Sequence, residues 1–60
     1  GYAIDAIYLD RQGCVLRIDE SLKPGRVLPM QLGARHVLEL PAGSARRRMI
    51  LTGDKLEVIQ

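Results

Sequence analysis

The stretch that decides the fold of this 60-residue chain is Ala34-Arg-His-Val-Leu-Glu-Leu-Pro-Ala-Gly-Ser-Ala-Arg-Arg-Arg-Met-Ile-Leu-Thr-Gly-Asp54. Its first part, residues 35–40, alternates in a way that predicts a β-strand with two different faces. The expected faces carry His36, Leu38 and Leu40 on one side and Val37 and Glu39 on the other. Pro41 cannot donate to a strand ladder, so it ends the strand at a sharp corner.

A short helix is expected directly after this corner. Ser44 is a candidate N-cap, because its hydroxyl can accept a hydrogen bond from the backbone N–H of Arg46 or Arg47. Residues 45–48 are helix formers and allow one or two turns. A Gly53-Asp54 turn then leads into a predicted closing strand at residues 56–59.

The N-terminal part of the chain predicts a long β-hairpin. Residues 2–9 are apolar at both alternating sets apart from Asp5, which indicates a strand covered on both faces. Asp10 and Gly13 bracket a type I turn that closes through a left-handed glycine bulge. Residues 14–18 then return antiparallel. Their expected faces carry Cys14, Leu16 and Ile18 on one side and Val15 and Arg17 on the other.

A crossing loop is predicted between residues 19 and 33, where turn-forming residues are frequent. Pro24-Gly25 suits the central pair of a type II turn, and only Val27-Leu28 could pair briefly with a strand. A loop of this length in a small domain is either functional or holds the two halves together.

Composition limits the classes of protein to consider. Sixty residues form one domain at most, and Leu, Ile, Val and Met must build the core because Phe and Trp are absent. The net charge of +2 is too balanced to imply nucleic-acid binding. Cys14 is the only cysteine, which excludes an intrachain disulfide and a Cys-based zinc site. No apolar run is long enough to span a membrane.

The order and spacing of six segments resemble the DUF192 family of small, mainly bacterial and archaeal proteins. The segments are Ile4-Asp5, Leu9-Asp10-Arg-Gln-Gly13, Lys23-Pro24, Ala34-Arg35, Val37-Leu-Glu-Leu-Pro-Ala-Gly43 and Gly53-Asp54. The resemblance implies that residues 1–60 are a single domain corresponding to the C-terminal half of a longer DUF192-like domain. It implies no biochemical function, since none is established for the family, and the chain's localisation stays unknown.

The end of the helix is expected to depart from the family pattern. Members of the family usually place Leu-Gly where this chain has Arg48-Met49, and that glycine suits a left-handed helix stop. Met49 in the left-handed conformation would cost about 1 kcal/mol, so a different helix end is expected here.

Asp5 is the first candidate site residue, as a buried polar site. A carboxylate within an apolar strand must be hydrogen-bonded or paired, so a structural role is favoured over a ligand or catalytic role. The enzymatic alternative is a hydrolase that uses Asp5 and Glu39, with Asp10 as a further candidate, as its acid and base. The separation of the carboxylates would decide that mechanism.

Gly43, Ser44, Arg46 and Arg47 form the second candidate, an anion-binding site at the start of the helix, where free N–H groups favour an anion. The competing interpretation of Arg46-Arg47-Arg48 is a solvated helix surface, because consecutive arginines point in different directions. Two tyrosines offer few stacking platforms, which makes nucleic acid an unfavoured partner. The chain has a single His, His36, and a single Cys, so the sequence assigns no metal site. No cofactor and no catalytic residue is assigned either.

These patterns predict a mainly β domain: a small, partly open antiparallel barrel or two-layer sheet of four or five strands with one short helix. The favoured role is a non-enzymatic binding or structural accessory module. The alternative is an anion or nucleic-acid binder that uses residues 46–48. A strand that is apolar on both faces needs more cover than the chain supplies, so we expect a homo-oligomer or a missing N-terminal segment to provide it.

Overall fold

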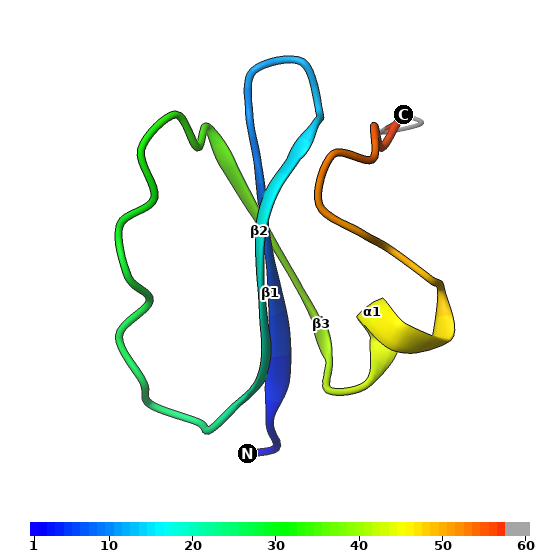
Figure 1. Cartoon of the computed structure of the whole chain (residues 1–60). Helices are drawn as coiled ribbons and strands as arrows, with labels where there is room; N and C mark the ends of the chain where they lie inside the picture. Colours follow the sequence, from blue (N-terminus) through cyan, green and yellow to red (C-terminus); the bar gives the residue numbers. More distant parts are fainter. Residues whose placement is uncertain (58–60) are drawn as a thin grey trace.

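Residues 1–57 are described in the computed structural model, and they form a three-stranded antiparallel sheet with one short helix (Figure 1). The elements are β1 (Ile4–Leu9), β2 (Val15–Leu22), β3 (His36–Pro41) and α1 (Ser44–Arg47), and the strand order is β2-β1-β3. The predicted mainly β fold is confirmed. The described residues contain three strands in an open sheet, fewer than the predicted four or five.

Two predicted pairings account for the difference. The closing strand at residues 56–59 lies partly outside the described residues; within them, Lys55 forms a single bridge with Cys14, and the Leu56 N–H donates to the carbonyl oxygen of Gly13 at 2.9 Å. Val27-Leu28 forms no strand. Val27 is 88% exposed, and Pro29, which follows this pair, has no N–H to continue a ladder.

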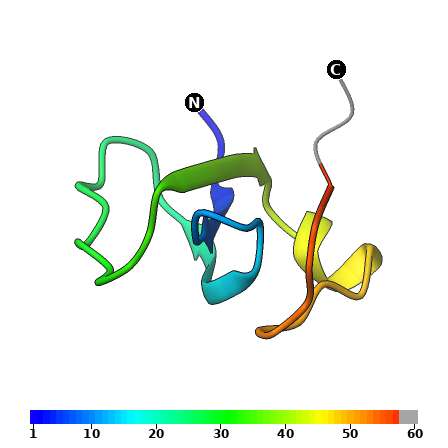
Figure 2. The same ribbon diagram turned by 90° about the horizontal axis from the view of Figure 1, so that it is seen from above.

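β1 is the central strand and the most buried part of the chain. Residues 5–9 are all at most 5% exposed, which confirms the prediction of a strand covered on both faces. The loop at residues 23–35 lies on one side of the sheet, whereas α1 and the segment that follows it lie on the other (Figures 1 and 2). Ile7, Leu9 and Val15 form the core on the α1 side, and Ile18, Leu40, Ile50 and Leu56 pack against them.

The predicted turn between β1 and β2 is confirmed. The Gly13 N–H donates to the carbonyl oxygen of Asp10 at 3.1 Å, and Gly13 has a φ of 88°. The Asp10 carboxylate also accepts the N–H groups of Gln12 and Cys14, at 2.8 and 2.9 Å. This side chain therefore holds the turn, as short polar residues commonly do at such positions.

Two bulges in β2 change the predicted hairpin. Leu9 pairs with Val15 and Tyr8 with Arg17, so Leu16 is an extra residue in the ladder. The predicted faces were wrong here, because this bulge places Val15 on the same face as Ile18. β2 also continues past Ile18 to Leu22, through a second irregularity at residues 20 and 21.

The predicted turn at Pro24-Gly25 and the predicted faces of β3 are both observed. The Arg26 N–H contacts the carbonyl oxygen of Lys23 at 3.4 Å and Gly25 has a φ of 79°, which confirms the type II turn at Pro24-Gly25. β3 pairs with β1 so that His36, Leu38 and Leu40 oppose Leu9, Ile7 and Asp5, which confirms the predicted faces of this strand.

The helix ends with the left-handed residue that was not expected. Met49 has a φ of 55°, and the Ile50 N–H reaches back to the carbonyl oxygen of Ala45 at 2.9 Å. The prediction of a different helix end was therefore wrong. Ala45 is buried and Ile50 packs on the core, so their packing holds Met49 in a conformation that its own side chain disfavours.

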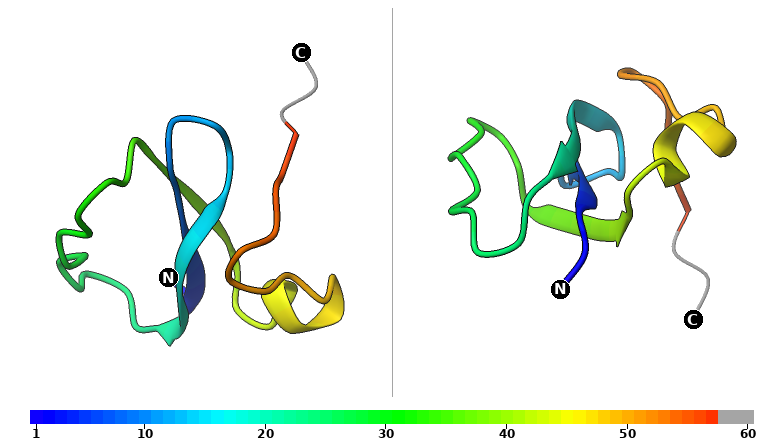
Figure 3. Two further views of the ribbon diagram at one scale, coloured as in Figure 1. Left: turned by 45° about the horizontal axis from the view of Figure 1, so that its top comes forward. Right: turned by 90° about the horizontal axis from the view of Figure 1, so that it is seen from below.

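After α1 the chain runs back beside the β1–β2 hairpin (Figures 1 and 3). The Val15 N–H donates to the carbonyl oxygen of Asp54 at 2.7 Å, and the Gly53 N–H donates to that of Val15 at 2.8 Å. These bonds, with that between Leu56 and Gly13, attach residues 53–56 to the start of β2 and close the α1 side of the fold.

We predict that Gly13→Val destabilises the protein by more than about 1 kcal/mol, because a β-branched side chain resists the left-handed region. A Cβ at position 13 would also lie 2.6 Å from the carbonyl oxygen of Leu56. Urea denaturation measures the difference, with Gly25→Val as the matched control. Gly25 has a φ of 79° with nothing within 4 Å, so it reports the conformational cost alone. Equal losses in the two variants would contradict the predicted clash.

Candidate functional site

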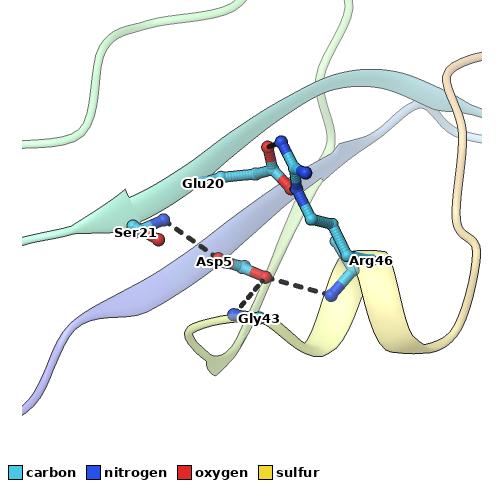
Figure 4. A network of polar contacts seen from close by, with 6 residues as sticks. Asp5, Glu20, Ser21, Gly43 and Arg46 are labelled. Carbon is cyan, nitrogen blue, oxygen red and sulfur yellow. Dashed lines mark hydrogen bonds and ion pairs between the residues drawn. The ribbon is translucent and has the colours of Figure 1, made fainter.

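The Asp5 carboxylate is the most completely enclosed polar group of the described chain. Asp5 is 0% exposed on β1 and accepts three backbone N–H groups from two other elements (Figure 4). The Ser21 N–H donates to Oδ1 at 3.0 Å, and the N–H groups of Gly43 and Ala45 donate to Oδ2 at 3.1 and 3.0 Å. The expectation that Asp5 is buried and hydrogen-bonded is confirmed.

Backbone geometry at both ends of this network turns the N–H groups toward Asp5. Ser21, which donates to Oδ1, belongs to the second irregularity of β2 and has a φ of 55°, an uncommon value for a residue other than glycine. Gly43 is the N-cap of α1, with a φ of 90°, and as a glycine it has no side chain of its own to cap the helix. Asp5 therefore caps a helix that is 38 residues away from it in sequence.

The charged form of Asp5 is the one that this site stabilises. Burial by itself raises the pKa of the carboxyl, but the N–H groups of Ala45, Ser21 and Gly43 and the positive charge of Arg47 together outweigh it. The pKa of Asp5 consequently lies below its ordinary value of 3.8. Asp5 is thus a permanent anion at neutral pH, with both oxygens occupied.

Ser44 does not cap the helix, so that prediction was wrong. It is the first residue of α1, where its hydroxyl donates to the carbonyl oxygen of Pro41 and accepts from the Arg47 guanidinium at 3.2 Å. Because Asp5 already accepts the N–H groups at this helix start, the Ser44 hydroxyl instead closes the corner between β3 and α1.

The arginines of α1 point to different surroundings. Arg46 pairs with Glu20 of β2 through Nε and Oε1 at 3.0 Å, and this hydrogen bond raises the pKa of the Arg46 guanidinium. Arg47 turns toward Ser44 and the Asp5 charge. The structure brings together the four residues proposed for an anion site, but Asp5 accepts the N–H groups of Gly43 and Ala45 at that position.

The carboxylates proposed for hydrolysis do not meet. On β1, Asp5 opposes Leu40 whereas Ala6 opposes Glu39, so Asp5 and Glu39 lie on opposite faces of the sheet. Glu39 is exposed, and Asp10 holds the turn of the first hairpin. A shared pocket, which an acid and base pair requires, is therefore not formed by these residues.

His36, which was considered as a metal ligand, is exposed at the start of β3. Among residues 1–57, no group of three or more His, Cys, Asp or Glu side chains could hold a metal ion. The helix that the described chain contains is too short to cross a membrane.

A second, partly buried network, which sequence reasoning missed, lies on the opposite face of β1. The Tyr8 hydroxyl donates to Asp19 at 3.0 Å, Arg17 Nε donates to the same carboxylate at 2.8 Å, and the Arg17 guanidinium lies 5.6 Å from the centre of the Tyr8 ring. Burial and then the hydrogen bond to Asp19 raise the pKa of Tyr8 above its ordinary value of 10.0. This network joins β2 to β1, and the Tyr8 hydroxyl and the Asp19 carboxylate are both hydrogen-bonded within it.

An open groove of about 890 Å³ lies between β3 and the segment after α1. Its apolar lining consists of Leu9, Val37, Leu38, Leu40, Ile50 and Leu56. Its charged and polar lining includes Arg11, His36, Arg48, Lys55 and Glu57. These residues come from the first hairpin, β3 and the C-terminal segment, so no local motif could have indicated the groove.

Comparison with known proteins gives one match. The family model DUF192, described as "Uncharacterized ACR", matches residues 1–58. No curated protein and no solved structure matches the chain. The further expectation, that the chain corresponds to the C-terminal half of the family's domain, stays a prediction.

We predict that Asp5→Asn destabilises the protein by about 2 to 4 kcal/mol at neutral pH, because it removes a charge that accepts three buried N–H groups. Urea denaturation measures the change. Glu39→Gln is the matched control, since Glu39 is an exposed carboxylate on the neighbouring strand. A loss no larger than that of the control would contradict a structural role for Asp5.

The difference between the wild type and Asp5→Asn should depend on pH in a defined direction. Because the folded-state pKa lies below the ordinary value of 3.8, the charge stabilises the fold fully above pH 3.8. This contribution is lost as the pH falls from 3.8 through the folded-state pKa, so the two proteins should converge in acid. A difference that stays constant over this range would show that the charge of Asp5 is not what the site stabilises.

Proposed function

Because this chain belongs to the DUF192 family, whose description assigns no activity, we propose a function from the geometry alone. We propose that the chain is a non-enzymatic binding or structural accessory module. Its residues 1–60 form one domain in this proposal, corresponding to the C-terminal half of a longer DUF192-like domain.

The observation that carries this proposal is the state of Asp5. Both of its oxygens accept backbone N–H groups, it is fully buried, and it is charged at neutral pH. A carboxylate in this state neither reaches a substrate nor exchanges a proton near neutral pH. Every fully buried side-chain nitrogen and oxygen within the described residues has a hydrogen-bond partner, which supports a structural use of the polar interior.

The alternative functions have less support. An anion or nucleic-acid binder would use residues 46–48, yet Glu20 already pairs with Arg46 and Asp5 accepts the N–H groups at the helix start. A hydrolase would need Asp5 and Glu39 in one pocket, and they lie on opposite faces of the sheet. These contacts leave the groove beside β3 free.

Backbone-amide NMR of the isotopically labelled chain tests the proposal, with a mixture of small esters, phosphoesters, carboxylates and apolar fragments as the probe. We expect fragments to bind without turnover and to shift amide signals of the residues that line the groove. Hydrolysis of an ester or phosphoester that Glu39→Gln abolishes would overturn the non-enzymatic proposal. Shifts confined to residues 43–48, and lost at high salt, would favour the anion-binding alternative instead.

We further propose that a second copy of the chain covers apolar side chains that the described residues leave open. Tyr2, Val27, Met30 and Leu32 are each at least 75% exposed, and Met49 and Leu51 are 80% and 66% exposed on the other side of the sheet. Val27, Met30 and Leu32 all belong to the loop at residues 23–35, and exposed apolar side chains that form a patch can mark an association surface. A segment that precedes Gly1 in a longer domain is the alternative cover.

Sedimentation velocity over a wide concentration range tests this association, with the expected result that the weight-average mass rises from monomer to dimer or beyond. The triple variant Val27→Ser, Met30→Ser and Leu32→Ser should shift association to higher concentration if the loop takes part. A chain that remains monomeric and soluble at high concentration would contradict association and favour the alternative of a preceding segment.

A further inference from the structure

The groove lies beside β3, whose outer edge is unpaired among residues 1–57. In the part of the chain that the structure describes, β3 pairs with β1 and with no other strand. An antiparallel ladder turns the backbone groups of alternate residues to opposite sides, so half of those in β3 face away from β1. Such an edge can accept the backbone of an extended peptide as a further strand.

The floor of the groove is apolar next to this edge. Leu38 is 40% exposed although its side chain lies on the core face of β3, and Leu40, Ile50 and Leu56 are only partly buried around it. A partner that covers these side chains would remove from water apolar surface that the described chain leaves exposed. The groove therefore favours an occupant with apolar side chains.

The rim of the groove is positively charged. Arg11, Arg48 and Lys55 line it, and Glu57 is its carboxylate among the described residues. The ion pairs within residues 1–57 are Arg17–Asp19 and Arg46–Glu20, so none of the three rim cations is neutralised there. The rim consequently favours an anionic occupant. A second copy of this chain, which itself carries a net charge of +2, is a poorer match than an acidic partner.

We propose that the groove binds an extended acidic segment of a partner protein as an added strand on the edge of β3. From the same face of this added strand, apolar side chains pack on Leu38 and Leu40 and carboxylates face Arg48 and Lys55. The inference rests on the proposed function, because it names the kind of partner that the binding module takes.

Fluorescence anisotropy with a labelled, end-capped peptide of repeating Val-Ser-Glu-Ser, which places Val and Glu on one face of a strand, tests the proposal on the full chain. We expect saturable binding that weakens as the salt concentration rises, whereas the corresponding peptide with Lys in place of Glu should not bind. Methylation of the peptide backbone nitrogens on the bonding edge should abolish binding, because an added strand needs those donors. Equal binding of the Lys peptide or of the methylated peptide would overturn the proposal.

Matched variants locate the site. The double variant Arg48→Glu with Lys55→Glu should weaken binding about tenfold or more. The double variant Lys23→Glu with Arg26→Glu changes the net charge by the same amount on the loop, and it should weaken binding far less. Leu38→Ser should weaken binding, and Leu32→Ser, at a loop residue that is 93% exposed, should not. Circular dichroism checks that each variant is folded. The salt dependence of peptide binding by the wild type tests the charge of the rim without any substitution.

The outcomes separate this inference from the function on which it rests. Failure of the acidic peptide to bind, or an equal loss of binding with the loop variants, overturns the inference and leaves the non-enzymatic proposal standing. A groove that is already occupied by a second copy would appear as dimerisation that Leu38→Ser prevents, and it would overturn the inference too. Cleavage of the peptide that Glu39→Gln abolishes would instead overturn the proposed function.

Discussion

The interaction on which the rest of this structure depends is the acceptance of three backbone N–H groups by the Asp5 carboxylate. It joins the central strand to an irregular turn of β2 at Ser21 and to the start of α1 at Gly43 and Ala45. A buried carboxylate without such partners would cost several kcal/mol, and these N–H groups would in turn lose their acceptor. One side chain thereby satisfies three backbone groups that belong to two different elements.

This dependence explains why the helix exists at all. A helix of four residues is far below the length at which isolated helices are stable, and α1 has no side-chain cap of its own. Asp5 caps it from β1, Ala45 is buried against the sheet, and Ile50 packs on the core after the left-handed turn at Met49. Ser21 and Met49 adopt positive φ values because these tertiary contacts outweigh the local preference.

The same arrangement leaves the surface, rather than the interior, available for function. Asp5, Tyr8, Asp19 and Arg17 are engaged with one another or with the backbone, so the buried polar groups hold the sheet together. Within residues 1–57, an unpaired strand edge, an apolar groove and a cationic rim meet along β3. They are the basis of the proposed peptide site.

The sequence by itself determined the features that depend on neighbouring residues. The apolar run at residues 2–9 predicted β1, alternation predicted the two faces of β3, and Asp10 with Gly13 predicted the first turn, because backbone sterics and side-chain period act locally. Only the tertiary structure decided the bulge at Leu16, the helix stop at Met49 and the use of Asp5 instead of Ser44 as the cap. Met49 depends on the core and the helix start depends on Asp5 of β1, both far away in sequence. Val15, next to the bulge, is bonded to the equally distant Gly53 and Asp54. The groove was likewise beyond local reasoning, because separate segments build it and its shape exists only once they are packed.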